Sequence, residues 1–203
     1  ADDPHALGMI VREDVTEPSN FRSVARLDEW MKAHGRIGLA GIDTRALTRR
    51  IRESGAPTGV IAHSPEGKFD IDALLAEARG WPGLEGMDLA KQVTAKMHYG
   101  WQGGIWRLGF GYEDAGNESH RPHVVALDYG AKRNIYRNLV RAGAKVSVLP
   151  ADASYEEVMA LKPDGIFLSN GPGDPAATGE YAVPVIRRLL DDKMPIFGIC
   201  LGH

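Results

Sequence analysis

Pro195-Ile196-Phe197-Gly198-Ile199-Cys200-Leu201-Gly202-His203 joins a short apolar run to the one cysteine among the 203 residues. The apolar part predicts a buried strand over 196–199, and Gly198-Ile199-Cys200-Leu201-Gly202 has the spacing of a nucleophile elbow with sulfur in place of the serine oxygen. A sharp turn from strand to helix needs glycines around the turn residue, whose side chain then projects above the sheet edge. The motif therefore predicts a cysteine at a helix N-terminus, where the reactive thiolate is favoured.

The cysteine also has a second interpretation. A free cysteine beside an apolar strand is commonly an inert packing residue, and the motif alone does not decide between the two. A second stretch, Leu168-Ser169-Asn170-Gly171-Pro172-Gly173-Asp174-Pro175, follows another apolar strand at 165–168. Its Gly-Pro-Gly turn exposes N–H groups suited to an anion or a developing oxyanion, although such a turn alone is more often an ordinary loop. Two such motifs after neighbouring strands together favour a reactive Cys200.

From residue 123 onward, apolar segments alternate with helical patterns. Strands are expected at 124–127, 145–149, 165–168 and 196–199, and helices at 134–142, 154–161 and 180–190, the last with Pro184 in its first turn. Strands rich in valine, isoleucine and leucine that alternate with helices predict a parallel α/β sheet with helices on both faces. Both motifs then fall at carboxyl ends of strands, where the reactive groups of such sheets gather.

The region from residue 8 to about residue 112 has a mixed, loop-rich pattern. We expect strands at 9–11, 37–42 and 58–62, and helices at 27–34, 44–54 and 71–78. The second helix carries Arg45, Arg49 and Arg52 on one face, which either contacts a partner or, as is more usual, is solvated. We predict an N-terminal domain over 1–115, a polar linker over 116–122 and a second domain over 123–203.

Composition excludes several classes of protein. Hydrophobic residues make up 43% and charged residues 25% of the chain, which is ordinary for a soluble globular protein. A net charge of −3 without a basic stripe argues against a nucleic-acid partner, and no apolar run is long enough to span a membrane. The seven histidines form no metal-binding pattern, so no metal site is predicted. One cysteine agrees with a reducing, cytoplasmic location.

Asn170-Gly171-Pro172-Gly173-Asp174-Pro175 and Gly198-Ile199-Cys200-Leu201-Gly202-His203 resemble the paired motifs of class I glutamine amidotransferases. Further segments narrow the resemblance to the small, glutamine-hydrolysing subunits of carbamoyl-phosphate synthases: 41–49 (GIDTRALTR), 82–89 (PGLEGMDL) and 128–135 (DYGAKRNI). The resemblance implies an α/β protein with a small mixed N-terminal domain followed by a parallel-sheet, flavodoxin-like amidotransferase domain that is incomplete at its C-terminus.

The resemblance also implies roles for particular residues. Cys200 is expected to attack the side-chain carbonyl of L-glutamine and form a γ-glutamyl thioester. Gly171, Gly173 and Leu201 are expected to contact substrate through their backbone: the Leu201 N–H by the elbow geometry, and the Gly171 N–H by resemblance, would stabilise the oxyanion. The implied partner is a large synthase subunit, which uses ATP, Mg²⁺ and bicarbonate to make carbamoyl phosphate for pyrimidine and arginine synthesis. No cofactor is expected in this subunit.

The sequence departs from the family where the chain stops. The family's catalytic histidine and glutamate lie well downstream of the nucleophile, and His203 does not occupy the position of that histidine. We therefore expect the chain to be truncated at both ends and inactive by itself. Asp128, Lys132 and Asn134 belong to a family motif, but for Asp128 and Asn134 a capping or loop-stabilising role is an equal alternative to contact with substrate or partner.

Two other functions stay open at this point. One is another class I amidotransferase that feeds GMP or anthranilate synthesis, against which the segment around Asp43-Thr44-Arg45 argues. The other is a non-catalytic structural or binding subunit in which Cys200 only packs.

Overall fold

A computed structural model of the protein describes residues 5–55, 57–114 and 120–203. Contacts divide the chain into two compact units, Ala1–Gly83 and Leu84–His203, and each is described by itself. Residues 84–114 belong to the second unit because one of their strands joins its central sheet. The linker predicted over 116–122 falls largely on residues 115–119, which lie outside the described residues, so the predicted domain limits stay a prediction.

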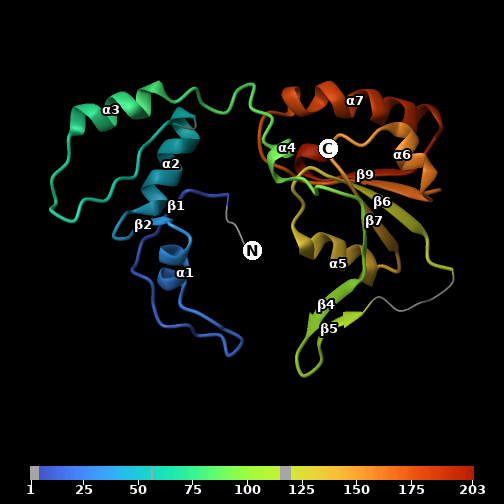
Figure 1. Ribbon diagram of the computed structural model, residues 1–203, viewed down its shortest axis with the longest axis horizontal. Coiled ribbons are helices and arrows are strands. Elements are labelled where there is room, and N and C mark those ends of the chain that lie inside the picture. The colour runs from blue at the N-terminus through green and yellow to red at the C-terminus, as the bar shows by residue number, and fades with distance from the viewer. Residues whose placement is uncertain (1–4, 56, 115–119) are drawn as a thin grey trace. The chain divides into compact units, whose positions relative to one another are not determined.

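The second unit is built on a five-stranded sheet with the order β3-β7-β6-β8-β9 (Figure 1). Four neighbouring strands of this sheet are parallel: β6 (His123–Asp128), β7 (Lys145–Pro150), β8 (Gly165–Leu168) and β9 (Ile196–Gly198). The strand β3 (Tyr99–Trp101) pairs antiparallel with β7 and closes the opposite edge. The expected parallel α/β sheet is confirmed for its four predicted strands, and the antiparallel strand β3 was not predicted.

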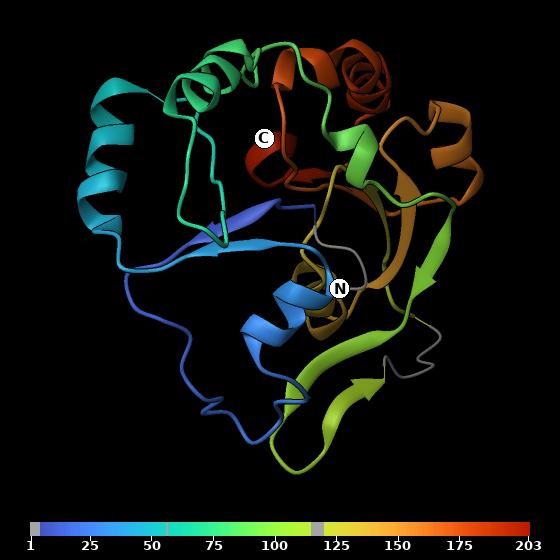
Figure 2. The ribbon, with the colours of Figure 1, turned by 60° about the vertical axis from the view of Figure 1, so that its left-hand side comes forward.

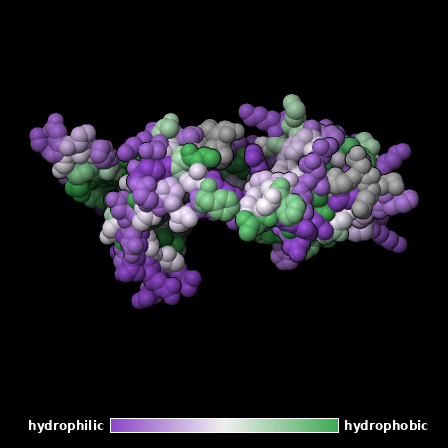
Figure 3. Space-filling view, turned by 90° about the horizontal axis from the view of Figure 1, so that it is seen from below, coloured by the Kyte–Doolittle hydropathy of each residue, from purple (hydrophilic) through white to green (hydrophobic). Residues whose placement is uncertain are grey.

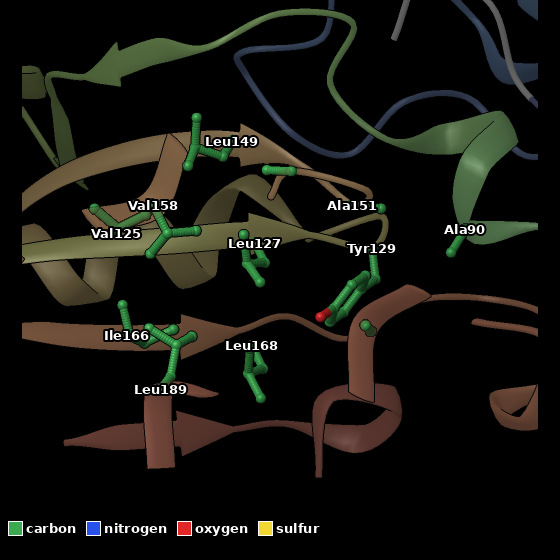
Figure 4. Packing of buried hydrophobic residues seen from close by; sticks show 12 residues of the cluster. Ala90, Val125, Leu127, Tyr129, Leu149, Ala151, Val158, Ile166, Leu168 and Leu189 are labelled. Carbon is green, nitrogen blue, oxygen red and sulfur yellow. The ribbon is translucent and has the colours of Figure 1, made fainter. Parts of the chain in front are cut away.

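Side chains alternate between the two faces of this sheet, as the twofold period of a strand requires. Val125, Leu127, Ile166 and Leu168 pack on one face with the helices α6 (Tyr155–Ala160) and α7 (Pro175–Asp191) (Figure 4). The intervening residues face α5 (Arg133–Arg141) in a second cluster, which contains Ala126, Tyr136, Val146, Val148 and Phe167. Both faces are covered, which explains why the strands are continuous apolar runs.

Residues 84–114 add a short helix and a hairpin to the second unit. The helix is α4 (Ala90–Val93), and the strands β4 (Gly103–Arg107) and β5 (Gly111–Asp114) pair antiparallel, as Figure 2 shows in green. The ring of Trp101 lies 5.4 Å from that of Tyr136. Trp101 thus packs on α5.

Helix α7 begins earlier than predicted. It starts at Pro175 rather than at residue 180, so Pro184 lies in its interior and not in its first turn. Asp174 caps the helix by accepting a hydrogen bond from the Ala176 N–H, and Pro175 takes the first helical position, where its missing N–H costs nothing. The helix continues past Pro184, which is exposed, without the main-chain hydrogen bond that the missing N–H of proline would have made.

The first unit contains one two-stranded parallel sheet, in which β1 (Gly8–Ile10) pairs with β2 (Ile37–Leu39). Its helices are α1 (Leu27–Ala33), α2 (Thr44–Ser54) and α3 (Ile71–Gly80). The side chains of Asp43 and Asp70 cap α2 and α3. These helices were predicted within three residues.

The strand predicted at 58–62 is wrong. Those residues, all within the described part of the first unit, form no ladder. Gly59 weakens a strand there, and Ile61 instead packs against β1: a Cβ at Gly8 would lie 3.3 Å from Cδ1 of Ile61.

None of the helices in the described ranges is long and apolar enough to cross a bilayer. Hydrophilic residues are distributed across the face of the molecule in Figure 3, interspersed with smaller hydrophobic areas.

Candidate functional site

The two motifs singled out in the sequence meet at one edge of the sheet. The Asn170–Asp174 loop follows β8, and the cysteine turn follows β9, its neighbour. Two backbone hydrogen bonds join them: Ile199 N–H donates to the Leu168 carbonyl at 3.0 Å, and Gly202 N–H donates to the Ser169 carbonyl at 3.1 Å. The predicted site residues that follow these strands are therefore held together by main-chain bonds.

Cys200 occupies the strained turn that the glycine spacing predicts. Its φ is +54°, in the left-handed region that residues other than glycine rarely adopt, and it opens a short 3₁₀ turn over Cys200–Gly202. The side chain is exposed and the thiol is free. Within the described residues this geometry presents the sulfur to solvent at the sheet edge, which favours the nucleophile interpretation of Cys200 over the packing interpretation.

Gly198 and Gly202, which flank the cysteine turn, have no room for a side chain because neighbouring atoms lie very close to them. A Cβ at Gly198 would lie 2.7 Å from the carbonyl carbon of Gly202, and one at Gly202 would lie 2.7 Å from Cβ of Leu168. Both distances are shorter than real side chains tolerate, so the turn closes only with hydrogen at these two positions.

Gly171 lies beside the cysteine turn. A Cβ at Gly171 would collide with the carbonyl oxygen of Tyr129 and would lie 2.8 Å from Cδ2 of Leu201. Gly171 and Leu201, whose N–H groups are the predicted oxyanion donors, are thus neighbours across the two motifs. No described hydrogen bond of the protein uses either N–H group.

Gly173 is packed against a segment from far earlier in the chain. Its φ is +100°, and a Cβ there would lie 2.7 Å from the Met87 carbonyl oxygen and 2.8 Å from the Leu89 nitrogen. This places Gly173 against the 82–89 segment rather than beside Cys200, and its predicted contact with substrate stays a prediction.

Asp174 ties the same segment to the loop, a role that sequence reasoning missed. Its Oδ2 accepts a hydrogen bond from Gly86 N–H at 2.8 Å, and its own N–H donates to the Met87 carbonyl at 2.9 Å. The N–H groups of Gly86 and Ala176 hold the pKa of the Asp174 carboxyl below its usual value. Asp174 and Pro175 were predicted only as part of an anion-binding loop, and nothing local in the sequence signals a partner 88 residues away.

Asp128 stabilises the loop after β6. The side chain is buried, and its two oxygens accept hydrogen bonds from the N–H groups of Ala95 at 2.9 Å, Gly130 at 3.0 Å and Ala131 at 2.8 Å. The loop-stabilising alternative therefore holds for Asp128.

Lys132 and Asn134 lie at the start of α5, where both are exposed. Lys132 is the N-cap residue and makes no side-chain cap hydrogen bond, so the capping role suggested for Asn134 is not formed. The Lys132 N–H points to Asn170 Oδ1 at 3.4 Å, and Asn170 Nδ2 donates to the Gly130 carbonyl at 3.2 Å. The loop after β6 is thus clamped to the loop after β8.

An apolar cavity of about 530 Å³ adjoins the cysteine turn. It is lined by Leu201, Gly202 and His203 of the turn, and by residues of β8, β9 and α7. The hydroxyl of Tyr129, which also lines it, is buried without a hydrogen-bond partner in the described structure. Among the described residues, no group of three His, Cys, Asp or Glu side chains is arranged to hold a metal ion.

Two family models match the chain. The model of class-I glutamine amidotransferases matches residues 125–203, and the model of the carbamoyl-phosphate synthase small chain, CPSase domain, matches residues 1–61. The first match contains the two motifs and the segment 128–135, and the second contains the segment 41–49, while the segment 82–89 lies outside both matched ranges.

Curated relatives extend the similarity to nearly the whole chain. A carbamoyl phosphate synthase small chain from Zymomonas mobilis is 67% identical over 199 residues, which cover 98% of this chain and 53% of the relative. Proteins of the same name from Rhizobium meliloti and Agrobacterium fabrum are 60% and 58% identical over 198 residues, with 98% of this chain and 49% of each relative covered. The chain spans about half the length of the curated relatives that it matches.

Proposed function

Because the chain belongs to the carbamoyl-phosphate synthase small-chain family, we propose that the protein containing it hydrolyses glutamine and supplies ammonia to a synthase partner. The observation that carries this proposal is the cysteine turn: Cys200 has an exposed thiol and a φ of +54°, and the side chain of the next residue, Leu201, packs against Gly171. A nucleophile next to two unused N–H groups is what attack on an amide requires, because the reaction builds negative charge on the carbonyl oxygen.

We assign the first chemical step to Cys200. Its thiolate attacks the side-chain carbonyl carbon of L-glutamine, and the carbonyl electron pair moves to oxygen, where the N–H groups of Leu201 and Gly171 stabilise it. When the oxyanion collapses, the carbon–nitrogen bond breaks and the nitrogen leaves as ammonia after it accepts a proton. The product on the protein is a γ-glutamyl thioester. Loss of one oxyanion donor typically costs about 3 kcal/mol of transition-state stabilisation.

In the second step water attacks the thioester carbonyl, the same N–H groups stabilise the second oxyanion, and glutamate leaves as the thiolate re-forms. We assign the proton transfers to a histidine and a carboxylate outside these 203 residues. His203 has its backbone N–H bound to the Cys200 carbonyl at 2.9 Å, and we give it no part in the chemistry.

We further propose that the ammonia is used by a large synthase subunit, which binds ATP and Mg²⁺ and makes carbamoyl phosphate from bicarbonate for pyrimidine and arginine synthesis. The names of the relatives, each called a small chain of carbamoyl phosphate synthase, support this partner. The match of residues 1–61 to the CPSase domain disfavours amidotransferases that feed GMP or anthranilate synthesis. We propose no cofactor for this chain itself.

The test uses the full-length protein in complex with its synthase partner. Cys200→Ser should abolish carbamoyl phosphate formation from glutamine while it leaves synthesis from added ammonia intact, since ammonia bypasses the thioester. If glutamine-driven synthesis survives the substitution, Cys200 is not the nucleophile. If neither nitrogen source supports synthesis in the unsubstituted complex, the proposed function itself fails.

A further inference from the structure

Ser169 lies where three segments of the candidate site meet: the loop after β6, the loop after β8 and the cysteine turn after β9. Ser169 is 0% exposed, so its side chain cannot touch a substrate in solution. Its main chain is bonded on both sides: its N–H donates to the Leu127 carbonyl at 3.2 Å, and its carbonyl accepts from Gly202 N–H at 3.1 Å. These two bonds do not depend on the side chain, and they would survive its removal.

The Ser169 hydroxyl makes two further hydrogen bonds whose direction is fixed by chemistry. Oγ accepts from Tyr129 N–H at 2.8 Å, because an amide nitrogen can only donate. The single hydroxyl hydrogen is then donated to the Asn170 carbonyl at 2.8 Å, because a carbonyl can only accept. The hydroxyl therefore holds the end of β6 and the Asn170 carbonyl in one fixed arrangement.

The Asn170 carbonyl belongs to the same peptide group as the Gly171 N–H. The described structure has no cis peptide bond, and a trans peptide is planar, so its C=O and N–H point in opposite directions. An anchor on the oxygen thus sets the direction of the N–H. The Asn170 side chain is held from outside as well, through the Gly130 carbonyl and the Lys132 N–H.

We propose that Ser169 is a positioning residue that aims the Gly171 N–H at the oxyanion of the glutamine reaction. This inference rests on the proposed function, because only that reaction gives the N–H an oxyanion to bind. Without the hydroxyl, the peptide loses its anchor and Gly171, which has no side chain, can rotate toward solvent. The cysteine turn keeps its own bonds to Leu168 and Ser169, so the nucleophile stays in place.

The test is Ser169→Ala in the full-length protein with its synthase partner. The matched control is Ser147→Ala, which also deletes a buried hydroxyl from the same sheet, one that lies 2.8 Å from Nε2 of His123 on neighbouring β6. Ser169→Ala should lower the glutamine-dependent kcat about 10- to 100-fold, as misalignment of a catalytic donor does, with KM for glutamine little changed. Ser147→Ala should leave both constants near those of the parent complex.

A second measurement distinguishes loss of the Gly171 N–H orientation from a general disturbance of the site. Alkylation of Cys200 by iodoacetamide is a displacement that forms no oxyanion, so its rate should be the same in Ser169→Ala and in the parent complex. Ammonia-dependent synthesis should also be unchanged. Equal losses in alkylation and in glutamine turnover would mean that the substitution displaces the thiol, which would overturn the proposal.

If Ser169→Ala does not yield a folded complex, Ser169→Cys replaces it, because a thiol of similar size is a much weaker donor. A glutamine-dependent kcat equal to that of Ser147→Ala in either Ser169 variant would also overturn the inference. The proposed function has its own control: if Cys200→Ser abolishes glutamine use and Ser169→Ala has no effect, only the role of Ser169 fails.

Discussion

The side chain of Leu201 occupies space that a side chain at Gly171 would need, since a Cβ at Gly171 would lie 2.8 Å from its Cδ2. The two residues follow different strands, yet they pack against each other at the carboxyl ends of β8 and β9. Gly171 is thereby held against the cysteine turn through the side chain of the residue that follows Cys200. A substitution that pushes the two apart should therefore affect both folding and chemistry.

Gly171→Ala should remove glutamine-dependent activity and destabilise the protein. The added methyl would collide with the Tyr129 carbonyl oxygen, which belongs to a rigid, clamped loop. Overpacking of this kind typically costs about 1–3 kcal/mol in the free energy of unfolding, and displacement of the donor should lower kcat about 100-fold. Denaturant unfolding and glutamine-dependent synthesis of the full-length protein measure the two effects.

Gly165→Ala is the control for this prediction. A Cβ there would meet the Pro195 carbonyl oxygen at 3.5 Å, an ordinary contact, so stability and activity should both be retained. If Gly171→Ala behaves like Gly165→Ala, the loop after β8 is looser than its contacts indicate.

Gly202→Ala and Gly179→Ala should have opposite effects on stability. At Gly202 the methyl would collide with Leu168 across the cysteine turn, so the free energy of unfolding should fall by about 1–3 kcal/mol. Gly179 lies inside α7, where a Cβ would lie 3.5 Å from Cγ2 of Val183, and alanine there should stabilise by up to about 1 kcal/mol. Thermal unfolding of both variants and of the parent measures these changes in stability. A stabilised Gly202→Ala protein would mean that the turn opens readily.

Local sequence signals predicted most of the second unit. The continuous apolar runs at 124–127 and 165–168 predicted buried parallel strands, and the Gly-x-Cys-x-Gly spacing predicted the turn at Cys200. These features could be predicted because each depends on residues that are adjacent in the chain. The beginning of α7 was missed for the opposite reason. Asp174 and Pro175 were interpreted as part of an anion-binding loop, and they also cap and open a helix.

Long-range contacts left no such signal. Asp174 binds Gly86 across 88 positions and Ser169 binds Tyr129 across 40, and neither pairing has a period or spacing that could predict it. The strand wrongly predicted at 58–62 also reflects long-range pairing, because a strand forms only where another strand is available to pair with it. Its residues have strand-like composition, but in the described part of the first unit β1 and β2 form a two-stranded sheet that these residues do not join.

Acid should destabilise the second unit in part through Asp174. Its pKa is lowered in the folded protein by the N–H groups of Gly86 and Ala176, so the folded state binds a proton less readily than the unfolded state. The stabilisation is present above the unfolded pKa, near 3.8, and is lost as the pH falls through the folded value. Asp174→Asn should therefore show a shallower loss of stability than the parent between about pH 5 and pH 2. Urea unfolding across that range measures the slopes, and equal slopes would contradict the prediction.

Asp128→Asn should destabilise the loop after β6 although the two side chains have nearly the same shape. The carboxylate accepts from three N–H groups, those of Ala95 on one oxygen and of Gly130 and Ala131 on the other. An amide has one accepting oxygen, so in either orientation its NH₂ group faces at least one buried donor and leaves it unsatisfied. The cost should be about 1–3 kcal/mol in the free energy of unfolding.

The loss should also be local, because the three donors lie in two segments that the Asp128 side chain joins. Amide hydrogen exchange of the full-length protein should become faster at Ala95, Gly130 and Ala131, while that of the β8 strand should change only with global stability. Asp191→Asn, at the exposed end of α7, is the matched charge control and should stay within about 0.5 kcal/mol of the parent. If Asp128→Asn matches that control in stability and in exchange, the carboxylate is not what holds the loop, and other contacts, among them the Ser169 and Asn170 hydrogen bonds, place Tyr129 against Gly171.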